Sequence, residues 1–216
     1  MAGEKITREK IIRAVLDSAF EKSSGGTSLA DISAILGIKK ASLYNHFASR
    51  DDMINATTAA CDVILKKVHL LPGKIELAAK KYSAQALTKA LAKRYLALFE
   101  KAPVFQVYVY VESQKFFDPE VSKIESEAKA RLTGECLVLL EVLAKQGRIS
   151  TEKANAASAI WLANGMRELL SYYLLERKNI LRNNPLGENS LFEAPDSDKT
   201  VKKIESLIAH FMNLVQ

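Results

Sequence analysis

The sequence predicts an all-α protein, in which a three-helix head containing a helix-turn-helix precedes a larger helical body. Apolar residues recur at three- and four-residue steps through almost every segment, which is the period of an amphipathic helix. Clusters of Gly, Pro and Asn separate these segments and mark turns. The one run with strand-like composition has no second run to pair with. We therefore expect a head over residues 1–52 and a body over residues 53–216.

The head begins with a helix that Thr7 can cap, and its apolar stripe runs from Ile11 to Phe20. Residues 23–26, Ser-Ser-Gly-Gly, are expected to break this helix. A stripe of this width must be covered, and the two short helices that follow are the nearest cover. The three helices together are expected to enclose one small core.

The segment 27–52 reads as two short helices joined by a tight turn. Thr27 and Ser28 can supply the cap of the first helix, and Gly37 stands where a left-handed residue ends a helix. The second helix starts near Lys39 and turns Leu43 inward, together with Phe47. Its other side chains are donors and acceptors of the kind that reach phosphates and base edges, and no acid lies between Asp31 and Asp51. This pattern is typical of a helix-turn-helix with a cationic reading face.

The body is expected to be helical throughout, with a Pro-Gly loop at residues 69–76 and a long exposed loop over 178–197. Leu77 and Tyr82 are assigned to the inner face of one long helix. Val104–Val111 is the ambiguous passage, because alternating valines and aromatics favour a strand locally. We interpret it as a buried helix, since a lone strand would have no partner. The remaining predicted helices span 49–67, 76–101, 118–146, 151–176 and 198–215.

Composition places few limits on function. The formal net charge is +6, but residues 1–55 hold eight Lys/Arg against seven Asp/Glu, so net charge alone argues weakly for nucleic acid. Cys61 and Cys136 lie far apart and are expected to be buried free thiols. The three histidines lack the spacing of a metal site, and we expect no metal, no cofactor and no catalytic constellation. The start carries no apolar signal segment, and no run approaches the ~20 apolar residues that span a bilayer, so we expect a cytoplasmic protein without membrane contact.

The stretch LGIKKASLYNHFASRDDM resembles the signature of the tetracycline-repressor (TetR) family. A Gly turn, a Leu-Tyr pair, a His-Phe pair and a following basic residue all fall in register, and the resemblance covers roughly residues 11–54. It implies base contacts from one group of residues and phosphate contacts from another. The implied base-contacting residues are Lys39, Lys40, Ala41 and Asn45, and the implied phosphate-contacting residues are Ser28, Ser42, Tyr44, His46 and Arg50.

Aromatic residues in the body are candidates to line a ligand cavity, although stripes of this kind are more often plain core. The resemblance strengthens the ligand interpretation, because members of the family usually bind a small molecule between body helices. The candidate ligand-binding residues are Tyr95, Phe99, Phe105, Tyr108, Phe116, Trp161 and Asn164.

The last two helices carry faces suited to a partner, and the final helix is expected to expose an apolar stripe. Two such helices from each subunit can form a four-helix interface around a two-fold axis, which is also how the family dimerises. The candidate dimer residues are Gly165, Leu169, Tyr172, Ile204, Leu207, Ile208 and Phe211.

These observations predict a ligand-responsive transcriptional regulator, more a repressor than an activator, that binds double-stranded operator DNA as a homodimer. Two other hypotheses remain open. One is a DNA-binding architectural protein that has no effector. The other is a helical enzyme or carrier in which the helix-turn-helix is incidental. The sequence does not identify the effector, the operator or the regulated genes.

Overall fold

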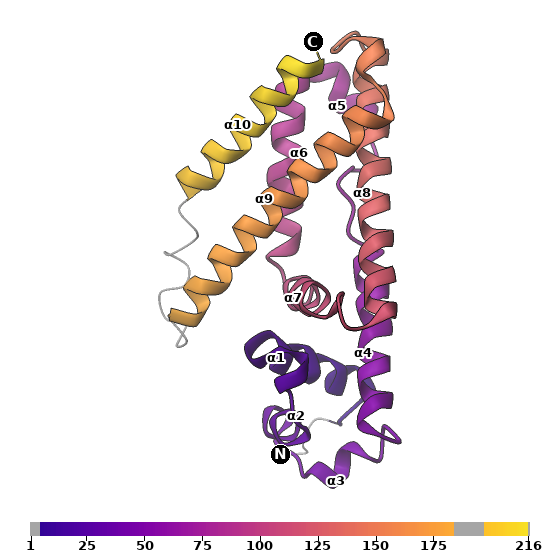
Figure 1. Ribbon diagram of the computed structural model, residues 1–216, viewed down its shortest axis with the longest axis vertical. Helices are drawn as coiled ribbons and strands as arrows, with labels where there is room; N and C mark the ends of the chain where they lie inside the picture. Colours follow the sequence, from indigo (N-terminus) through magenta and orange to yellow (C-terminus); the bar gives the residue numbers. More distant parts are fainter. Residues whose placement is uncertain (1–4, 184–196, 216) are drawn as a thin grey trace. The chain divides into compact units, whose positions relative to one another are not determined.

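The computed structural model describes residues 5–183 and 197–215, which form ten α-helices and one short 3-10 helix and contain no strand (Figure 1). The all-α prediction is therefore confirmed for the described chain. The helices group into two compact units, each made of two stretches of the sequence. The first unit contains Met1–Val68 and Lys101–Ala128, and the second contains His69–Glu100 and Lys129–Gln216. The predicted domain boundary at residue 52 stays a prediction.

The first unit is built around α1 (Arg8–Gly26), which packs against α2 (Leu29–Leu36), α4 (Arg50–Leu65) and α7 (Val104–Gln114) (Figure 1). The short helix α3 (Lys40–Leu43) packs on α2. Apolar side chains from α1 to α4 form one buried cluster, as the stripes at helical spacing predict. Its members include Ile11, Val15, Ile32, Leu43, Phe47 and Met53.

Side-chain caps fix where the head helices begin. Thr7 Oγ1 accepts a hydrogen bond from the backbone N–H of Lys10 at 3.3 Å, and Ser49 Oγ accepts one from Asp52 at 3.0 Å. Both are the N-cap contacts that the sequence favours. The expected break in the first helix is present as a kink, because Ser23 takes the left-handed value φ 68° although helical hydrogen bonding continues to Gly26.

The ambiguous segment Val104–Val111 is helical, and α7 extends it to Gln114. Phe105, Val107, Tyr110 and Val111 are buried, and the hydroxyl groups of Tyr110 and Thr58 form a hydrogen bond of 3.2 Å between α7 and α4. Gln106 Nε2 also donates to Asp17 Oδ1 of α1 at 3.2 Å. Packing on both α1 and α4 therefore outweighs the local strand preference of the valines.

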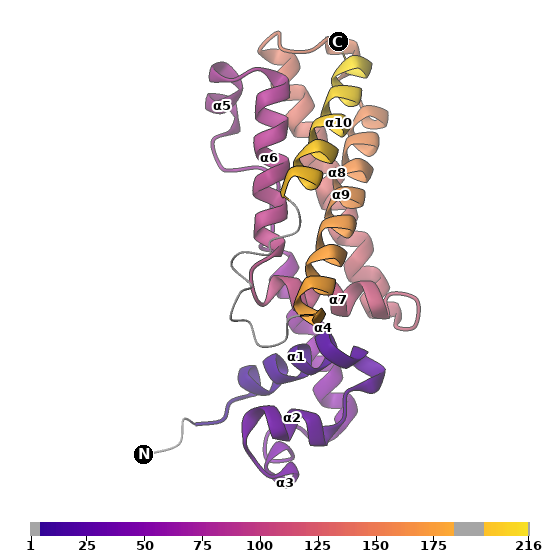
Figure 2. The same cartoon turned by 90° about the vertical axis from the view of Figure 1, so that its left-hand side faces the viewer.

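The second unit contains α5 (Ile75–Lys81), α6 (Ala84–Phe99), most of α8 (Pro119–Lys145), the 3-10 turn Thr151–Lys153, α9 (Ala156–Asn183) and α10 (Ser197–Val215). Figure 2 shows α10 beside α6 and α9, and it packs against both.

Three predictions about this part of the chain were wrong. The expected helix 76–101 is two helices, because the chain breaks at residues 82–83 and Ser83 caps α6. Leu77 and Tyr82 are consequently exposed rather than inward. The helix expected to end near residue 176 continues to Asn183, so residues 178–183 of the predicted loop are helical. Residues 184–196 of that prediction lie outside the described residues.

No helix in the described ranges has both the length and the apolar character needed to cross a membrane.

Candidate nucleic-acid interface

The turn between α2 and α3 is fixed by hydrogen bonds at both ends of α2. At the start, Ser28 Oγ accepts from the N–H of Asp31 at 3.2 Å, while the N–H of Ser28 donates to Asp31 Oδ2 at 2.9 Å. This reciprocal capping box satisfies two backbone donors that a helix start leaves free. At the end, Gly37 takes a left-handed φ of 65°, and the N–H of Ile38 donates to Ser33 O at 3.0 Å. Only glycine adopts such a φ without steric cost.

Asp31 carries a second stabilising contact. Lys22 Nζ lies 2.5 Å from Asp31 Oδ1, so an ion pair joins α1 to the first turn of α2. This hydrogen bond from Lys22, together with those from Ser28, holds the pKa of the Asp31 carboxyl well below its usual range. The carboxylate is therefore charged at neutral pH, where it also complements the N-terminal end of the helix dipole.

The recognition helix α3 is only four residues long, and its position depends on what it packs against. Leu43 and Phe47, one turn apart, are both buried in the head core. Helices this short are not stable alone in water. The buried pair therefore holds α3 in place and directs its remaining side chains outward.

The outward side chains form an exposed polar surface, which we call the reading face and define as Lys39, Lys40, Ala41, Tyr44 and Asn45. All five are exposed, and the side chains of the two lysines and Asn45 form no hydrogen bond or ion pair among the described residues. Ser42 and His46 are half-buried beside them. Two cationic side chains without a nearby acid are suited to an anionic partner such as the phosphate backbone of DNA.

Two of the predicted phosphate contacts are engaged within the head. Ser28 forms the capping box, and Arg50 Nη2 donates to the carbonyl oxygens of Thr27 at 3.2 Å and Ser24 at 3.4 Å. Arg50 thereby ties the start of α4 to the connection between α1 and α2. The sequence pattern did not indicate these contacts, because Thr27 and Ser24 lie 23 and 26 positions before Arg50 in the chain.

Sequence reasoning also missed Arg8, which contacts the turn that follows α3. Arg8 Nη1 donates to His46 O at 2.6 Å, and its guanidinium lies over the Phe47 ring, 4.1 Å from the ring centroid. The available signal was its place directly after the Thr7 cap, at the very start of α1. That position does not reveal a partner 38 residues later.

The candidate ligand-binding residues are divided between the two units. Tyr95, Phe99, Trp161 and Asn164 belong to the second unit, whereas Phe105, Tyr108 and Phe116 belong to the first. Tyr95 and Phe99 are buried and meet edge-on at 5.0 Å between ring centroids, and burial raises the pKa of Tyr95 above its ordinary value. Phe105 meets Phe20 at 4.9 Å, within the packing of the first unit. Asn164 is exposed.

Phe116 is 81% exposed and does not belong to the packed interior, so its role in ligand binding stays a prediction. The turn between α7 and α8 holds both Phe116 and Phe117 away from the core, because α7 ends at Gln114.

The apolar stripe of α10 was expected to face a partner, but it is covered within the chain. Ile204, Ile208 and Phe211 are buried, and the Phe211 ring stacks on Trp161 of α9 at 5.3 Å. Leu169 is also buried, and Leu207 packs so closely on Gly165 that an added Cβ there would lie 2.7 Å from Leu207 Cδ1. The prediction that this stripe is exposed was therefore wrong, because α6 and α9 of the same chain cover it. Tyr172 is half-buried, and Lys203 lies over its ring.

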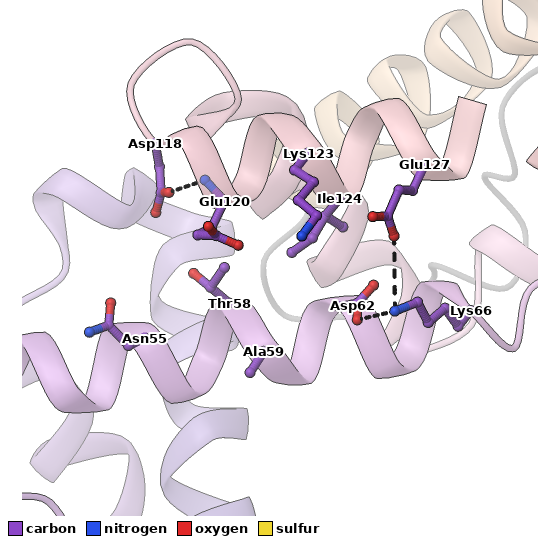
Figure 3. Close-up of a pocket in the computed structure, with 10 residues that line it drawn as sticks. All are labelled: Asn55, Thr58, Ala59, Asp62, Lys66, Asp118, Glu120, Lys123, Ile124 and Glu127. Atoms are coloured by element: carbon purple, nitrogen blue, oxygen red, sulfur yellow. Dashed lines mark hydrogen bonds and ion pairs between the residues drawn. The ribbon is translucent and has the colours of Figure 1, made fainter. Parts of the chain in front are cut away.

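A polar groove of about 450 Å³ lies between α4 and the start of α8, both in the first unit (Figure 3). Lys66 crosses it, pairing with Asp62 at 2.5 Å on its own helix and with Glu127 at 3.9 Å on α8. Four carboxylates and two lysines line the groove, so it has a net negative lining and is not a DNA-binding surface.

The two cysteines are buried, and burial raises the pKa of both the Cys61 and the Cys136 thiols to about 12. Thiols of this kind stay protonated at neutral pH and are poor nucleophiles. Within the described residues, no group of three or more potential ligands could hold a metal ion.

Comparison with known proteins supports a DNA-binding role for the head. Residues 11–57 match the family model for bacterial regulatory proteins of the tetR family. The HTH-type negative transcriptional regulator IcaR of the biofilm operon icaADBC, from Staphylococcus aureus, is 27% identical over 142 residues, covering 59% of this chain and 74% of IcaR.

Solved structures show the same fold over nearly the whole chain. A putative TetR-family transcriptional regulator from Mesorhizobium loti superposes with a TM-score of 0.61 at 13% identity, covering 96% of this chain and 95% of that protein. The TetR-family regulator PfmR from Thermus thermophilus gives a TM-score of 0.52 at 15% identity, covering 94% of this chain and 97% of PfmR. Residues 11–57 are therefore similar to the DNA-binding region of tetR-family regulators, and the fold over nearly the whole chain is similar to that of solved TetR-family regulators.

Proposed function

We propose that this regulator is a homodimeric repressor that binds operator DNA through α3 and releases it when a small molecule binds in the helical body. The observation that carries the DNA-binding part is the reading face, where Lys39 and Lys40 stand exposed in a stretch without acids from Ile32 to Arg50. IcaR, the relative described above, is a negative regulator, which favours repression over activation.

Base readout is assigned to Lys39, Lys40, Ala41 and Asn45, because they are exposed along α3 and at its end. Lysine suits the O6 and N7 acceptors of guanine, the amide of asparagine suits adenine, and the alanine methyl suits the methyl of thymine. Ser42, Tyr44 and His46 flank this row and are assigned to phosphates. Ser28 and Arg50 are assigned a supporting role instead, because their polar atoms already have partners in the head.

The DNA-binding proposal is tested with a duplex selected from a random library by the wild-type protein. Lys40→Ala is expected to lose about 1–3 kcal/mol on the selected duplex and to relax the preference at one base position. Lys67→Ala, just beyond the C-terminal end of α4, is the matched control, and its binding should stay close to wild type. Equal binding of every sequence by the wild-type protein would contradict the proposal.

The dimer surface is assigned to the outer face of α9. Ile160, Asn164, Glu168, Ser171 and Leu175 recur at three- and four-residue steps, and all five are exposed. The Leu175 side chain is 62% exposed, and Ile160 stands on the same side. A face with apolar ends and a polar centre can pair with its own copy across a two-fold axis, where the same patch of each subunit takes part. The half-buried residues Gly165, Tyr172 and Leu207 lie beside this face.

Light scattering tests the assembly. Leu175→Glu is expected to convert a dimer to a monomer, because it places a charge without a partner in an apolar contact of each subunit. Leu77→Glu is the matched control, since Leu77 is about equally exposed but lies on α5. A full-length wild-type protein that is monomeric, or a Leu175→Glu variant that stays dimeric, would contradict this interface.

The effector is proposed to be a largely apolar small molecule that binds near the buried aromatic pair Tyr95 and Phe99. A ligand weakens DNA binding only if it prefers a body conformation that binds DNA less well. The coupling must be reciprocal, so operator DNA would weaken ligand affinity by the same factor, usually about 5–150. Titration of candidate ligands with and without the selected duplex measures this factor. Equal ligand affinity in the two states would leave an architectural DNA-binding protein.

A further inference from the structure

The recognition helix has a weakly anchored end. α3 ends at Leu43, and the chain then turns through Tyr44, Asn45 and His46 before Phe47 returns to the core. The turn is held by short-range backbone hydrogen bonds, Tyr44 N–H to Ala41 O at 3.2 Å and His46 N–H to Leu43 O at 3.0 Å. These bonds define the local shape of the turn. They do not connect it to the rest of the head.

Arg8 makes that connection. Its Nη1 donates to His46 O at 2.6 Å, and its guanidinium lies 4.1 Å from the centroid of the Phe47 ring. One side chain therefore contacts two consecutive residues of the turn through two different interactions, a charged hydrogen bond and a cation–π contact. A carbonyl near the end of a helix is also where the helix dipole favours a cation.

The backbone of Arg8 is held in place at the start of α1. Thr7 caps α1, so Arg8 is the first residue of a helix whose next turn contributes Ile11 to the head core. A rigid helix start on one side and a short turn on the other are thus joined by a side chain at the surface. Arg8 is exposed, and its loss leaves no buried polar group without a partner.

We propose that Arg8 is a positioning residue for DNA binding: it clasps the turn after α3 to the start of α1 and so fixes the orientation of the reading face. The inference rests on the proposed function of that face. Without the clasp, α3 keeps its buried anchors but its outer side chains sample more orientations. Binding to a specific sequence then has to fix the orientation of these side chains, and the entropy lost in doing so weakens specific binding.

A direct contact between Arg8 and a DNA phosphate is the competing interpretation, and the two make different demands on the side chain. A phosphate contact needs mainly a positive charge, which lysine also carries. The clasp needs a planar guanidinium that stacks on an aromatic ring and donates sideways at the same time, which lysine cannot reproduce. Loss of a phosphate contact also reduces the slope of log affinity against log salt by about 0.9, whereas loss of a clasp does not.

The test uses the full-length protein, a duplex selected by the wild type from a random library, and a random duplex as the non-specific probe. Fluorescence anisotropy gives the affinity for both at several salt concentrations for wild type, Arg8→Ala and Arg8→Lys. Arg13→Ala is the matched control, because it removes the same charge from the same helix, where Arg13 pairs with Asp17 of α1 at 3.1 Å. Thermal unfolding of each variant is measured alongside.

The clasp predicts that Arg8→Ala and Arg8→Lys both bind the selected duplex about tenfold or more weakly, a change of the size of one good base contact. Affinity for the random duplex, the salt slope and the unfolding temperature stay near the wild-type values, and Arg13→Ala binds both duplexes as the wild type does. A merely structural role would lower the unfolding temperature and affect both duplexes equally.

Three outcomes would overturn the inference. Wild-type affinity in Arg8→Ala means that the clasp is not needed. A reduced salt slope with binding restored by Arg8→Lys means a phosphate contact. A large fall in the unfolding temperature means that Arg8 holds the fold. If the wild-type protein selects no duplex at all, the proposed function fails instead.

Discussion

Helices α3 and α10 are both amphipathic, but they have opposite roles in the molecule. α10 spans 19 residues, and its apolar stripe is buried against α6 and α9 of the same chain. α3 spans four residues, is anchored by the buried side chains of Leu43 and of Phe47 in the turn that follows, and leaves its polar side uncovered. The long helix is therefore part of the structure of the body. The short one is a surface that the rest of the head holds in place.

This difference shows what an apolar stripe can and cannot indicate. A stripe predicts that a helix face will be covered, but the cover can be another part of the same chain. An uncovered polar face with unpaired cations is stronger evidence for an external partner, because nothing within the described chain neutralises it. In this protein the uncovered polar face lies on α3, and the covered apolar stripe lies on α10.

The largest effect is expected for Phe211→Ala in α10. Phe211 is buried and stacks on Trp161, so its removal leaves a cavity and should lower the free energy of unfolding by about 3–5 kcal/mol. Urea unfolding measures this change. Leu77→Ala, exposed on α5, is the control and should change stability by less than about 0.5 kcal/mol. A small effect of Phe211→Ala would mean that α10 is not a structural part of the body.

Leu43→Ala tests the opposite role of α3. Leu43 is fully buried in the head, so we expect a loss of about 2–5 kcal/mol of stability, together with loss of specific DNA binding. The control is Ile35→Ala, which removes an exposed side chain of α2. Anisotropy with the selected duplex and urea unfolding check both effects. Unchanged DNA binding in a destabilised Leu43→Ala variant would show that α3 does not need its anchor.

Ser28→Ala removes the cap of α2 and is expected to cost about 1 kcal/mol of stability. Ser28→Asp keeps an oxygen acceptor at the cap and serves as the comparison, although it sets a second carboxylate beside Asp31. Denaturant midpoints of the two variants and the wild type give the result. If Ser28→Ala also weakens specific DNA binding, this supports the claim that the head holds α3 in place, since α2 leads into the turn before α3.

Arg50→Ala is expected to lower stability by about 0.5–1.5 kcal/mol, because Arg50 Nη2 donates to two carbonyls of the α1–α2 connection. The slope of log affinity against log salt should stay at the wild-type value. A slope reduced by about 0.9 would instead restore Arg50 to the phosphate-contacting residues that the sequence resemblance implies.

The smallest effect concerns pH. The pKa of Asp31 is lowered in the folded protein by Lys22 and Ser28, so its contribution to stability is fully present above the unfolded pKa of about 4. That contribution is lost as the pH falls toward the folded pKa. Asp31→Asn should therefore be less stable than the wild type at pH 7, and the difference should shrink as the pH is lowered below about 4. A difference that stays constant from neutral to strongly acidic pH would rule out this linkage.

Local signals in the sequence predicted the helix starts of the head well. Thr7 and Ser28 cap helix starts and Gly37 ends α2, as expected, because capping depends on residues only three or four apart. The lack of a second strand-like run predicted α7 correctly, although the valines and aromatics of Val104–Val111 favour a strand locally.

Contacts between distant residues could not be predicted from local pattern. Arg8 meets His46 across 38 residues, and Arg50 meets Ser24 across 26. Leu77 is exposed because the chain breaks before α6, which Ser83 caps. The apolar period in the sequence continues across this break and therefore did not reveal it. The burial of the α10 stripe depends on α6, about 100 residues earlier in the chain. In each case the side chain suits more than one partner, and only the assembled fold decides which one it meets.

The division of the first unit into two stretches also affects how the protein is made. Residues 69–100, which belong to the second unit, are synthesised between α4 and α7. The ribosome therefore releases α1 to α4 before the helix that packs most extensively on α1 exists. During that interval the side of α1 that receives Phe105 is open to water, with Phe20 among its residues. Domains generally fold as they emerge, from the N-terminal end first. The core that α1 to α4 share can form during that interval, but the face of α1 that packs on α7 is covered only once residues 104–114 have been made.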